Sequence, residues 1–357
     1  MSIYIHIPFC SNICSYCDFA KFYYNSNWVD NYLSSLEKEI KSNYKGEIVD
    51  TIYIGGGTPT CLDINQLERL LKIINLFKKN DIEFTVETNV DLSLDKIKLL
   101  KKYGVNRISI GVQTVNPKYL KFLNRNHTKE DVIKLVNLLK KNDFNINVDL
   151  IYAIPNQTLE ELKEDLDFIL NLDVNHISTY SLIIEPHTKL YIDKISNIDE
   201  DLDYQMYKLI NKKLNKYHHY EISNFAKKNY ESKHNLVYWN NLNYYGFGLG
   251  ASGYIDNIRY DNTKSYNNYI NCKYVSEKHE LDLNETISNE FILGLRKIDG
   301  IDVSEFYKKY NIEITSIDIV KKMLKENKLI LTDKLKINPK YIYICNTILV
   351  NFIDLKI

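Results

Sequence analysis

The sequence predicts an α/β protein whose first two-thirds folds around a parallel β-sheet. Short β-branched runs alternate there with stretches in which apolar residues recur at helical spacing. Polar and glycine-rich residues gather directly after the predicted strands, where parallel sheets form their ligand sites. The alternation fits a doubly wound sheet or a partial barrel, in both cases with right-handed crossovers. It fades after about residue 190, which indicates a different C-terminal part.

The predicted elements follow from the period of the apolar residues. Strands are predicted over Ile3–Ile7, Thr51–Ile54, Glu83–Glu87, Arg107–Ile110, Asn147–Ile151 and His176–Leu182. Helices are predicted over Trp28–Tyr44, Asn65–Lys79, Ser93–Tyr103, Lys129–Lys141 and Leu159–Leu172. From Glu285 onward the pattern predicts helices followed by a small helix–strand unit, which we expect to form a separate C-terminal domain.

Composition narrows the class of protein. The chain has 357 residues, 45% of them hydrophobic, which is enough for a buried core and for more than one domain. Its 46 basic and 46 acidic side chains cancel, so no basic excess points to nucleic acid or to an acidic membrane surface. Met1–Phe9 shows no leader pattern, and apolar runs such as Ile342–Leu349 are too short to cross a bilayer. We therefore expect a cytoplasmic protein with reduced thiols and no integral membrane segment.

The strongest motif is a cysteine loop placed directly after the first predicted strand. Cys10, Cys14 and Cys17 form a CxxxCxxC pattern. A cubane iron–sulfur cluster has four irons, so three thiolates leave one iron without a protein ligand. The amino and carboxylate groups of S-adenosylmethionine (SAM) can chelate that iron. An electron from the cluster then breaks a C–S bond of the sulfonium and gives a 5′-deoxyadenosyl radical, chemistry that the cofactor supplies.

Other roles for these thiols fit less well. Zinc usually takes four ligands in pairs, and the sequence contains no second CxxC. His6 is a fourth ligand in principle, but we expect it to pack or hydrogen-bond within its strand. A redox site needs two cysteines at the start of a helix. Cys61, Cys272 and Cys345 are isolated, which favours buried apolar thiols.

An ordered series of motifs extends the cysteine loop. Tyr4-Ile-His-Ile-Pro-Phe-Cys10 precedes the other two cysteines, and Gly55-Gly-Gly-Thr-Pro59 follows. The series resembles the radical-SAM superfamily, and within it the branch that contains the oxygen-independent coproporphyrinogen III oxidase and the HemW group of heme chaperones. Further matches are Gly111-Val-Gln113, Asn124-Arg125, Asn147-Val-Asp149-Leu-Ile-Tyr152 and Gly294-Leu-Arg296.

The resemblance implies a fold and a division of the chain. It implies a partial (β/α)6 TIM-like barrel followed by a smaller C-terminal α/β domain that is winged-helix-like. We expect residues 1–235 to form the radical-SAM core with the cluster and SAM site, and residues 236–357 to form the C-terminal domain.

The resemblance also implies the SAM contacts. Glycines after a strand let the backbone approach a ligand closely, and carboxylates accept hydrogen bonds from ribose hydroxyls or an amine. An arginine offers a planar fork to a carboxylate. The implied contacts are Tyr4, Gly56, Gly57, Thr58, Glu87, Gln113, Arg125 and Asp149.

Three features favour the chaperone group over the oxidase. Cys17 is followed by Asp18-Phe19, whereas the oxidase motif continues with another cysteine two residues later. The chain begins almost at the cluster strand, whereas the oxidase carries an N-terminal extension. His234-Asn-Leu-Val-Tyr238-Trp239 matches the HNxxYW motif that the chaperone group associates with heme. An imidazole can ligate the heme iron, and the two rings can contact the macrocycle. The alternative is that the histidine caps a turn and the aromatic rings fill the core.

These features predict a heme chaperone that carries a [4Fe–4S] cluster, SAM and heme. The expected partners are recipient hemoproteins, among which we expect respiratory ones, and a reductant for the cluster. The cluster and SAM would act more as a structural or regulatory switch than as a turnover centre, so enzymatic activity stays open. The alternatives are oxidative decarboxylation of coproporphyrinogen III to protoporphyrinogen IX, and radical chemistry on an unrelated substrate.

Overall fold

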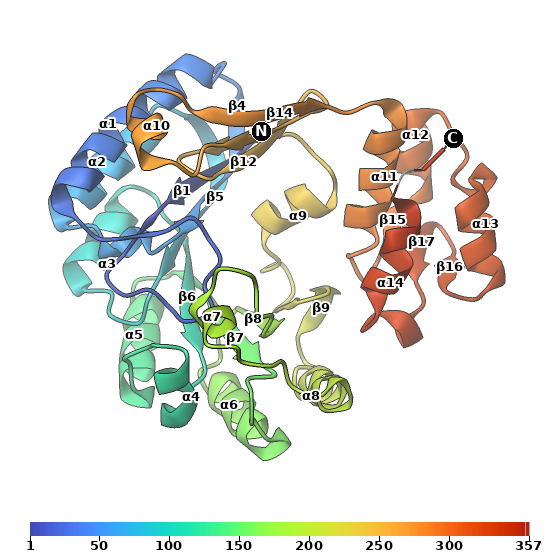
Figure 1. The fold of residues 1–357 in the computed structure, drawn as a ribbon, viewed down its shortest axis with the longest axis horizontal. Coiled ribbons are helices and arrows are strands. Elements are labelled where there is room, and N and C mark those ends of the chain that lie inside the picture. The colour runs from blue at the N-terminus through green and yellow to red at the C-terminus, as the bar shows by residue number, and fades with distance from the viewer. Residues whose placement is uncertain (354, 357) are drawn as a thin grey trace.

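The computed structural model describes residues 1–353, 355 and 356, apart from the side chains of residues 79–81. Its centre is a run of parallel strands that curves into a partial barrel (Figure 1). All of the predicted strands lie side by side in this run, each parallel to the next. In spatial order they are β1 (Ser2–Ile7), β4 (Ile48–Gly56), β5 (Lys78–Thr88), β6 (Arg107–Gln113), β7 (Asn145–Tyr152) and β8 (His176–Ser181).

Helices cover the outside of the barrel (Figure 1). They are α1 (Ser26–Asn43), α2 (Ile64–Ile74), α3 (Leu94–Lys102), α4 (Pro117–Phe122), α5 (Lys129–Lys141) and α6 (Leu159–Asn171). The expected end of the second helix at Lys79 is wrong. The helix stops at Ile74 because the chain enters β5 at Lys78, which pairs with Ile48 of β4.

Strand periodicity decides which side chains reach the barrel interior. On β1, Ile3, Ile5 and Ile7 are buried in the core under the helices. Tyr4 and His6 point the other way, because successive strand residues face opposite sides of a sheet. Their rings lie next to each other on the interior face of β1, and the Tyr4 ring also packs on Tyr53 of β4.

Further strands extend the sheet at both edges. Within the described residues the main sheet has twelve strands. One edge continues through β11 (Tyr244–Phe247), which is parallel to β1, to β12 (Ser252–Ile255), β13 (Ile258–Asn262) and β14 (Val275–Glu280). The other edge ends in the antiparallel strands β10 (Asn224–Ala226) and β9 (His218–Glu221). The short β2 (Phe9–Cys10) and β3 (Phe22–Tyr23) pair outside this sheet. The connecting helices are α7 (Lys189–Ile192), α8 (Glu200–Lys213), α9 (Lys233–Trp239) and α10 (Tyr266–Ile270).

The C-terminal part is a separate helical unit with a small antiparallel sheet, beside the barrel in Figure 1. It has its own hydrophobic cluster, whose first buried residue in the sequence is Ile287. Buried residues between Tyr245 and Tyr269 still belong to the hydrophobic cluster of the barrel. The division at residue 235 stays a prediction. The elements are α11 (Leu283–Gly294), β15 (Ile301–Asp302), α12 (Val303–Tyr310), α13 (Asp318–Lys325), β16 (Leu329–Leu331), β17 (Lys334–Ile337) and α14 (Cys345–Leu349). No helix in the described part of the chain is both long enough and apolar enough to cross a bilayer.

Candidate cofactor site

A cavity of about 410 Å³ opens at the carboxyl ends of the parallel strands. This is the end at which parallel α/β sheets bind ligands, and the volume suits a small molecule. The three motif cysteines line it together with most of the polar residues that the sequence predicted. The predicted residues in its wall are Cys10, Cys14, Cys17, Gly56, Gly57, Thr58, Glu87, Gln113, Arg125 and Asp149.

The cysteine loop is held in place by backbone hydrogen bonds on both sides. At its ends, β2 pairs with β3, so the loop leaves and returns at neighbouring positions. In its middle, the Ser15 N–H donates to the Leu123 carbonyl at 3.2 Å, and the Ser15 carbonyl accepts from the Leu190 N–H at 3.1 Å. The loop is therefore fixed by α4 on one side and by α7 on the other.

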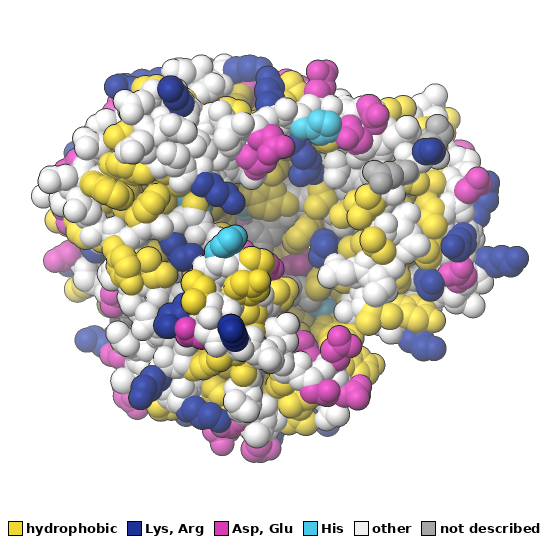
Figure 2. Space-filling view, viewed as in Figure 1, with side chains coloured by type: hydrophobic (Ala, Val, Ile, Leu, Met, Phe, Trp, Pro, Cys, Tyr) yellow, Lys and Arg dark blue, Asp and Glu magenta, His cyan; other side chains and the backbone are white. Residues whose placement is uncertain are grey.

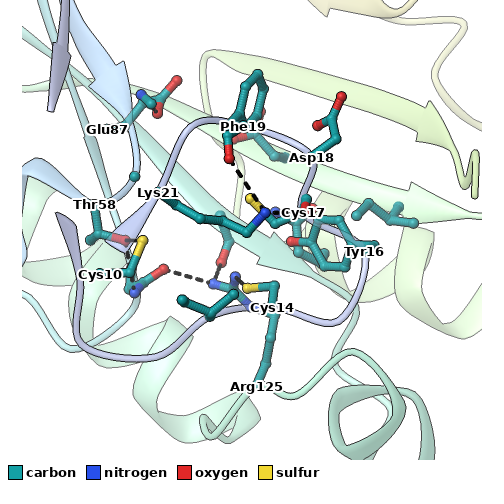
Figure 3. A pocket seen from close by; sticks show the side chains of 18 of the residues that line it. Cys10, Cys14, Tyr16, Cys17, Asp18, Phe19, Lys21, Thr58, Glu87 and Arg125 are labelled. Carbon is teal, nitrogen blue, oxygen red and sulfur yellow. Dashed lines mark hydrogen bonds between the residues drawn. The ribbon is translucent and has the colours of Figure 1, made fainter. Parts of the chain in front are cut away.

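Each thiol has a polar neighbour that can stabilise a thiolate (Figure 3). Thr58 Oγ1 donates to Cys10 Sγ at 3.8 Å, and Arg125 Nη1 donates to Cys14 Sγ at 3.3 Å. Lys21 reaches across the space between Cys10 and Cys17 and donates to the Cys17 carbonyl. Burial raises the pKa of Cys10 to about 11, while Thr58 and Lys21 oppose that rise. The free thiol is therefore protonated, and a metal that binds it must displace the proton.

The three thiols do not form a site for a single metal ion. In the described residues, no three His, Cys, Asp or Glu side chains surround a position for a single ion. A cubane makes a different demand, because each of three thiolates binds a different iron at a different corner. The three thiols on one cavity and the cations beside them fit that demand.

The glycine loop after β4 brings backbone close to the cysteine loop. A Cβ at Gly57 would lie 2.6 Å from the Phe9 carbonyl oxygen, and one at Gly56 would lie 2.4 Å from the His6 ring. Gly56 also has a φ of +101°, which favours glycine. The loop can therefore form only with small residues, and it leaves free backbone surface in the cavity wall.

Two partly buried carboxylates stand at the floor of the cavity. Glu87 accepts hydrogen bonds from Tyr53 Oη at 2.7 Å and from the Gly56 N–H at 3.0 Å. Burial raises the pKa of Glu87 to about 7. Asp149 accepts from Ser109 Oγ at 3.2 Å and from Asn147 Nδ2 at 2.8 Å, and burial raises its pKa as well.

Unpaired polar atoms remain in the wall on the side of β6. Arg125 donates to Asn89 Oδ1 at 3.0 Å and to the Gly111 carbonyl, but its buried Nε has no partner. Gln113 adopts a left-handed φ of +68°, and its buried Oε1 also has no partner. Buried polar groups normally find partners, so these two atoms mark where a polar ligand would complete the site.

Some cavity residues were not predicted from the sequence. Tyr53, Asn89 and Lys21 line the cavity. Tyr53 lies two residues before Gly55 on β4, so the strand period was a signal that it faces the interior.

Tyr4 was predicted as a SAM contact but is absent from the described cavity wall, and its hydroxyl bonds instead to His6 Nδ1 at 3.0 Å. His6 hydrogen-bonds within its strand as expected, through Tyr4, and its Nε2 also lies 2.8 Å from the Ala20 carbonyl outside the strand. Cys272 is exposed, which corrects its assignment as a buried thiol, because it follows the end of α10 in a left-handed turn.

The predicted heme residues lie at the opposite end of the barrel interior. His234 is buried, with Nδ1 2.8 Å from Thr51 Oγ1 and Nε2 2.8 Å from Tyr238 Oη. Its ring stacks on Tyr53, 5.2 Å between centroids. Burial lowers the pKa of His234 to about 3, so the imidazole is neutral. The indole Nε1 of Trp239 is buried and without a partner. The structure thus brings His234 and Tyr238 into contact, apart from the cofactor cavity.

The chain is similar to proteins of the radical SAM superfamily and to two heme chaperones. A model of the radical SAM superfamily matches residues 4–169, and membership of that superfamily implies a [4Fe–4S] cluster and SAM. The heme chaperone HemW of Lactococcus lactis is 45% identical over 87% of this chain and 85% of its own length. The heme chaperone HemW of Bacillus subtilis is 43% identical over 87% of this chain and 86% of its own length.

A solved structure supports the fold over nearly the whole chain. The coproporphyrinogen III oxidase HemN from Escherichia coli, described as a radical SAM enzyme, superposes with a TM-score of 0.86. The match covers 98% of this chain and 89% of that one at 23% sequence identity, so it shows the fold alone. The identity to the curated relatives is higher and extends over most of each chain, so it shows the family as well as the fold. The chain belongs to the HemW family of the radical SAM superfamily.

Proposed function

We propose that this protein is a heme chaperone that carries a [4Fe–4S] cluster and SAM and delivers heme to recipient hemoproteins. The observation that carries the proposal is the convergence of three thiols and the strand-end polar residues on one cavity. The curated relatives that are 45% and 43% identical to this chain are named heme chaperones, which supports the second half of the proposal.

In this proposal Cys10, Cys14 and Cys17 hold the cluster. Arg125 and Lys21 balance the negative charge of the thiolates. When bound, the cluster and SAM supply one-electron cleavage of the sulfonium C–S bond. We infer that the pair acts more as a structural or regulatory switch than as a turnover centre.

The SAM contacts follow from the cavity wall. Gly56 and Gly57 present backbone at the cavity surface, and Glu87 and Asp149 present carboxylate oxygens that can accept from ribose hydroxyls or an amine. Gln113 and Arg125 offer the unpaired atoms described above. Thr58 lies between the cysteine loop and the other predicted SAM contacts. It contacts Cys10 and accepts a hydrogen bond from Asn89 Nδ2 at 3.4 Å. We keep Tyr4 in the set as a prediction.

Contact of heme with His234, Tyr238 and Trp239 also stays a prediction. The His234 imidazole must leave Thr51 or Tyr238 before either nitrogen can ligate iron. For recipients we infer respiratory hemoproteins, and for the cluster an external reductant. The HemN fold keeps coproporphyrinogen III oxidation as the second candidate, although Asp18-Phe19 after Cys17 differs from the oxidase motif.

The test uses anaerobically reconstituted full-length protein. We expect iron and inorganic sulfide near four of each per chain, a Soret band on heme titration, and transfer of that heme to an apo-hemoprotein. Cys14→Ala should lose the iron and sulfide, whereas Cys272→Ala, at an exposed thiol outside the loop, should keep them. Absence of heme binding with conversion of coproporphyrinogen III would establish the oxidase instead. Zinc in the loop without sulfide would overturn both candidates.

A further inference from the structure

The segment between β8 and α7 (residues 182–188, the β8–α7 segment) forms one lip of the cofactor cavity. Leu182, Ile183 and Glu185 line the cavity wall. Leu182 and Leu190 are buried in a small hydrophobic cluster against which Tyr16 of the cysteine loop packs. The Leu190 N–H donates to the Ser15 carbonyl at 3.1 Å. The β8–α7 segment is therefore fixed at both ends beside the cysteine loop.

A tight turn in this segment presents His187. The Thr188 N–H donates to the Glu185 carbonyl at 3.3 Å, with Pro186 and His187 as the two central residues. His187 has a φ of +69°. Proline followed by a residue of positive φ is the pattern of a type II turn, in which glycine or asparagine usually takes the second central position. A histidine there adopts an uncommon conformation, and such conformations cluster at functional sites.

The ring of His187 is both exposed and free, a combination that none of the other seven histidines shows, although the partly buried His127 also has an unpaired Nε2. Within the described residues it has no hydrogen bond, ion pair or ring contact, and its side chain is exposed. Three others are buried with both nitrogens engaged: His6, His176 and His234. Two are exposed but bonded to carboxylates: His218 with Glu231 and His279 with Glu285. Two are partly buried: His127, whose pKa burial lowers to about 4, and His219, which stacks on Phe225.

Apolar surface surrounds this free imidazole. Ile183 is 64% exposed and Phe19, in the cysteine loop opposite, is 57% exposed, and both border the cavity. Tyr191 and Ile192 of α7 are also exposed. Figure 2 shows hydrophobic side chains gathered over this part of the face, at the edge of a hollow. Exposed apolar groups concentrated at one rim mark a binding surface.

Charge near the rim suits an amphipathic ligand with carboxylate arms. Lys189 follows the turn and is 68% exposed; its partner is Asp193, directly after the end of α7. An exposed ion pair of this kind contributes little, so Lys189 is available to a carboxylate of a ligand. Heme combines three features that match this rim: a flat apolar ring system, an iron that binds imidazole, and two carboxylate arms.

We propose that heme docks over the mouth of the cofactor cavity and that His187 supplies an axial ligand to its iron. The macrocycle lies on Phe19 and Ile183, and Lys189 contacts a propionate. This proposal rests on the proposed function, because it takes heme as the ligand, and it locates the heme away from His234. It also places the heme against the cysteine loop, so binding of heme can affect binding of the cluster, and the reverse.

The experiment titrates heme into wild type, His187→Gly and His279→Gly, each anaerobically reconstituted with cluster and SAM. Glycine suits the positive φ at position 187, so this variant should keep the fold. We expect heme affinity to fall at least about tenfold in His187→Gly with a shifted Soret band, and added imidazole to restore the wild-type spectrum. His279→Gly removes another exposed histidine, one that pairs with Glu285, and should change neither the affinity nor the spectrum. Ile183→Ser should weaken affinity without shifting the band.

The outcomes separate the two proposals. Wild-type protein that binds no heme would overturn the proposed function and this inference with it. Wild-type binding that His187→Gly leaves unchanged in affinity and spectrum would overturn this inference alone. A loss in His187→Gly that imidazole fails to reverse would also count against iron ligation by His187.

Discussion

The two ends of the barrel interior use the same kinds of side chain in opposite ways. Strand β4 serves both, since Thr51 near its start bonds His234 and Gly56 at its end borders the cofactor cavity. At the carboxyl end, Gln113 Oε1 and Arg125 Nε are buried without partners. A polar site that is left incomplete by the protein is one that a ligand can complete.

At the amino end, the protein itself pairs both ring nitrogens of His234, although the indole Nε1 of Trp239 is buried without a partner. Glu83 accepts from the backbone N–H of His234 at 3.0 Å and of Lys233 at 3.1 Å, at the start of α9. Thr51 and Tyr238 take the two ring nitrogens of His234, and the Tyr238 ring packs edge-on against Tyr244. The difference teaches that residue type alone does not mark a ligand site. Whether the protein already satisfies the polar atoms is the better guide.

The largest effect that tests this comparison is expected from His234→Ala. The change removes a buried ring and leaves Thr51 Oγ1 and Tyr238 Oη without their partner, so the free energy of unfolding should fall by about 4 kcal/mol. Chemical denaturation of the metal-free protein measures it. His279→Ala, at an exposed ring, should stay within about 0.5 kcal/mol of wild type. A loss below about 1 kcal/mol in His234→Ala would show that this end is not a structural network.

The next effect is a pH dependence that comes from Glu87. Its folded pKa is about 7 and its ordinary value is near 4.5, so the folded state holds the proton more tightly than the unfolded state. The free energy of unfolding should therefore fall as pH rises from about 4.5 to about 7, by up to about 3 kcal/mol, and stay level above that. Glu87→Gln should remove this part of the slope and be the more stable protein at pH 8.

Denaturation of the metal-free protein at several pH values checks this expectation. Glu160→Gln, at a carboxylate that is 69% exposed, is the matched control and should keep the wild-type slope. Equal slopes in wild type and Glu87→Gln would mean that the cavity floor holds Glu87 ionised at low pH.

The sequence was sufficient for the barrel because its signals are local. The apolar period placed each core strand and five of the six helices that cover the barrel. The rule that ligands bind at strand ends placed the cysteines, the glycine loop, Glu87 and Asp149 on one cavity. The short helix α4 was missed. It spans only Pro117–Phe122, too few residues for a helical period to show.

What the sequence did not reveal depends on contacts between distant segments. The role of Tyr53 follows from Glu87, 34 residues later, and the burial of His234 follows from Thr51, 183 residues earlier. The free ring of His187 becomes visible only when the partners of every other histidine are known. A motif in one segment cannot show which of its polar atoms a second segment will satisfy.

The smallest expected effect concerns how tightly the cavity wall is built. In Gly57→Ala the new Cβ meets the carbonyl oxygens of Phe9 and Ile7 at 2.6 and 2.8 Å, and backbone cannot move aside cheaply. We expect a loss of about 1–3 kcal/mol in the free energy of unfolding, together with weaker SAM binding by calorimetry. In Gly111→Ala the nearest atom is the amide end of Gln113 at 3.1 Å, which can rotate away, so its loss of stability should be smaller. If Gly57→Ala is no worse than Gly111→Ala, the glycine loop moves freely against the cysteine loop, and the cavity at this end is not preformed.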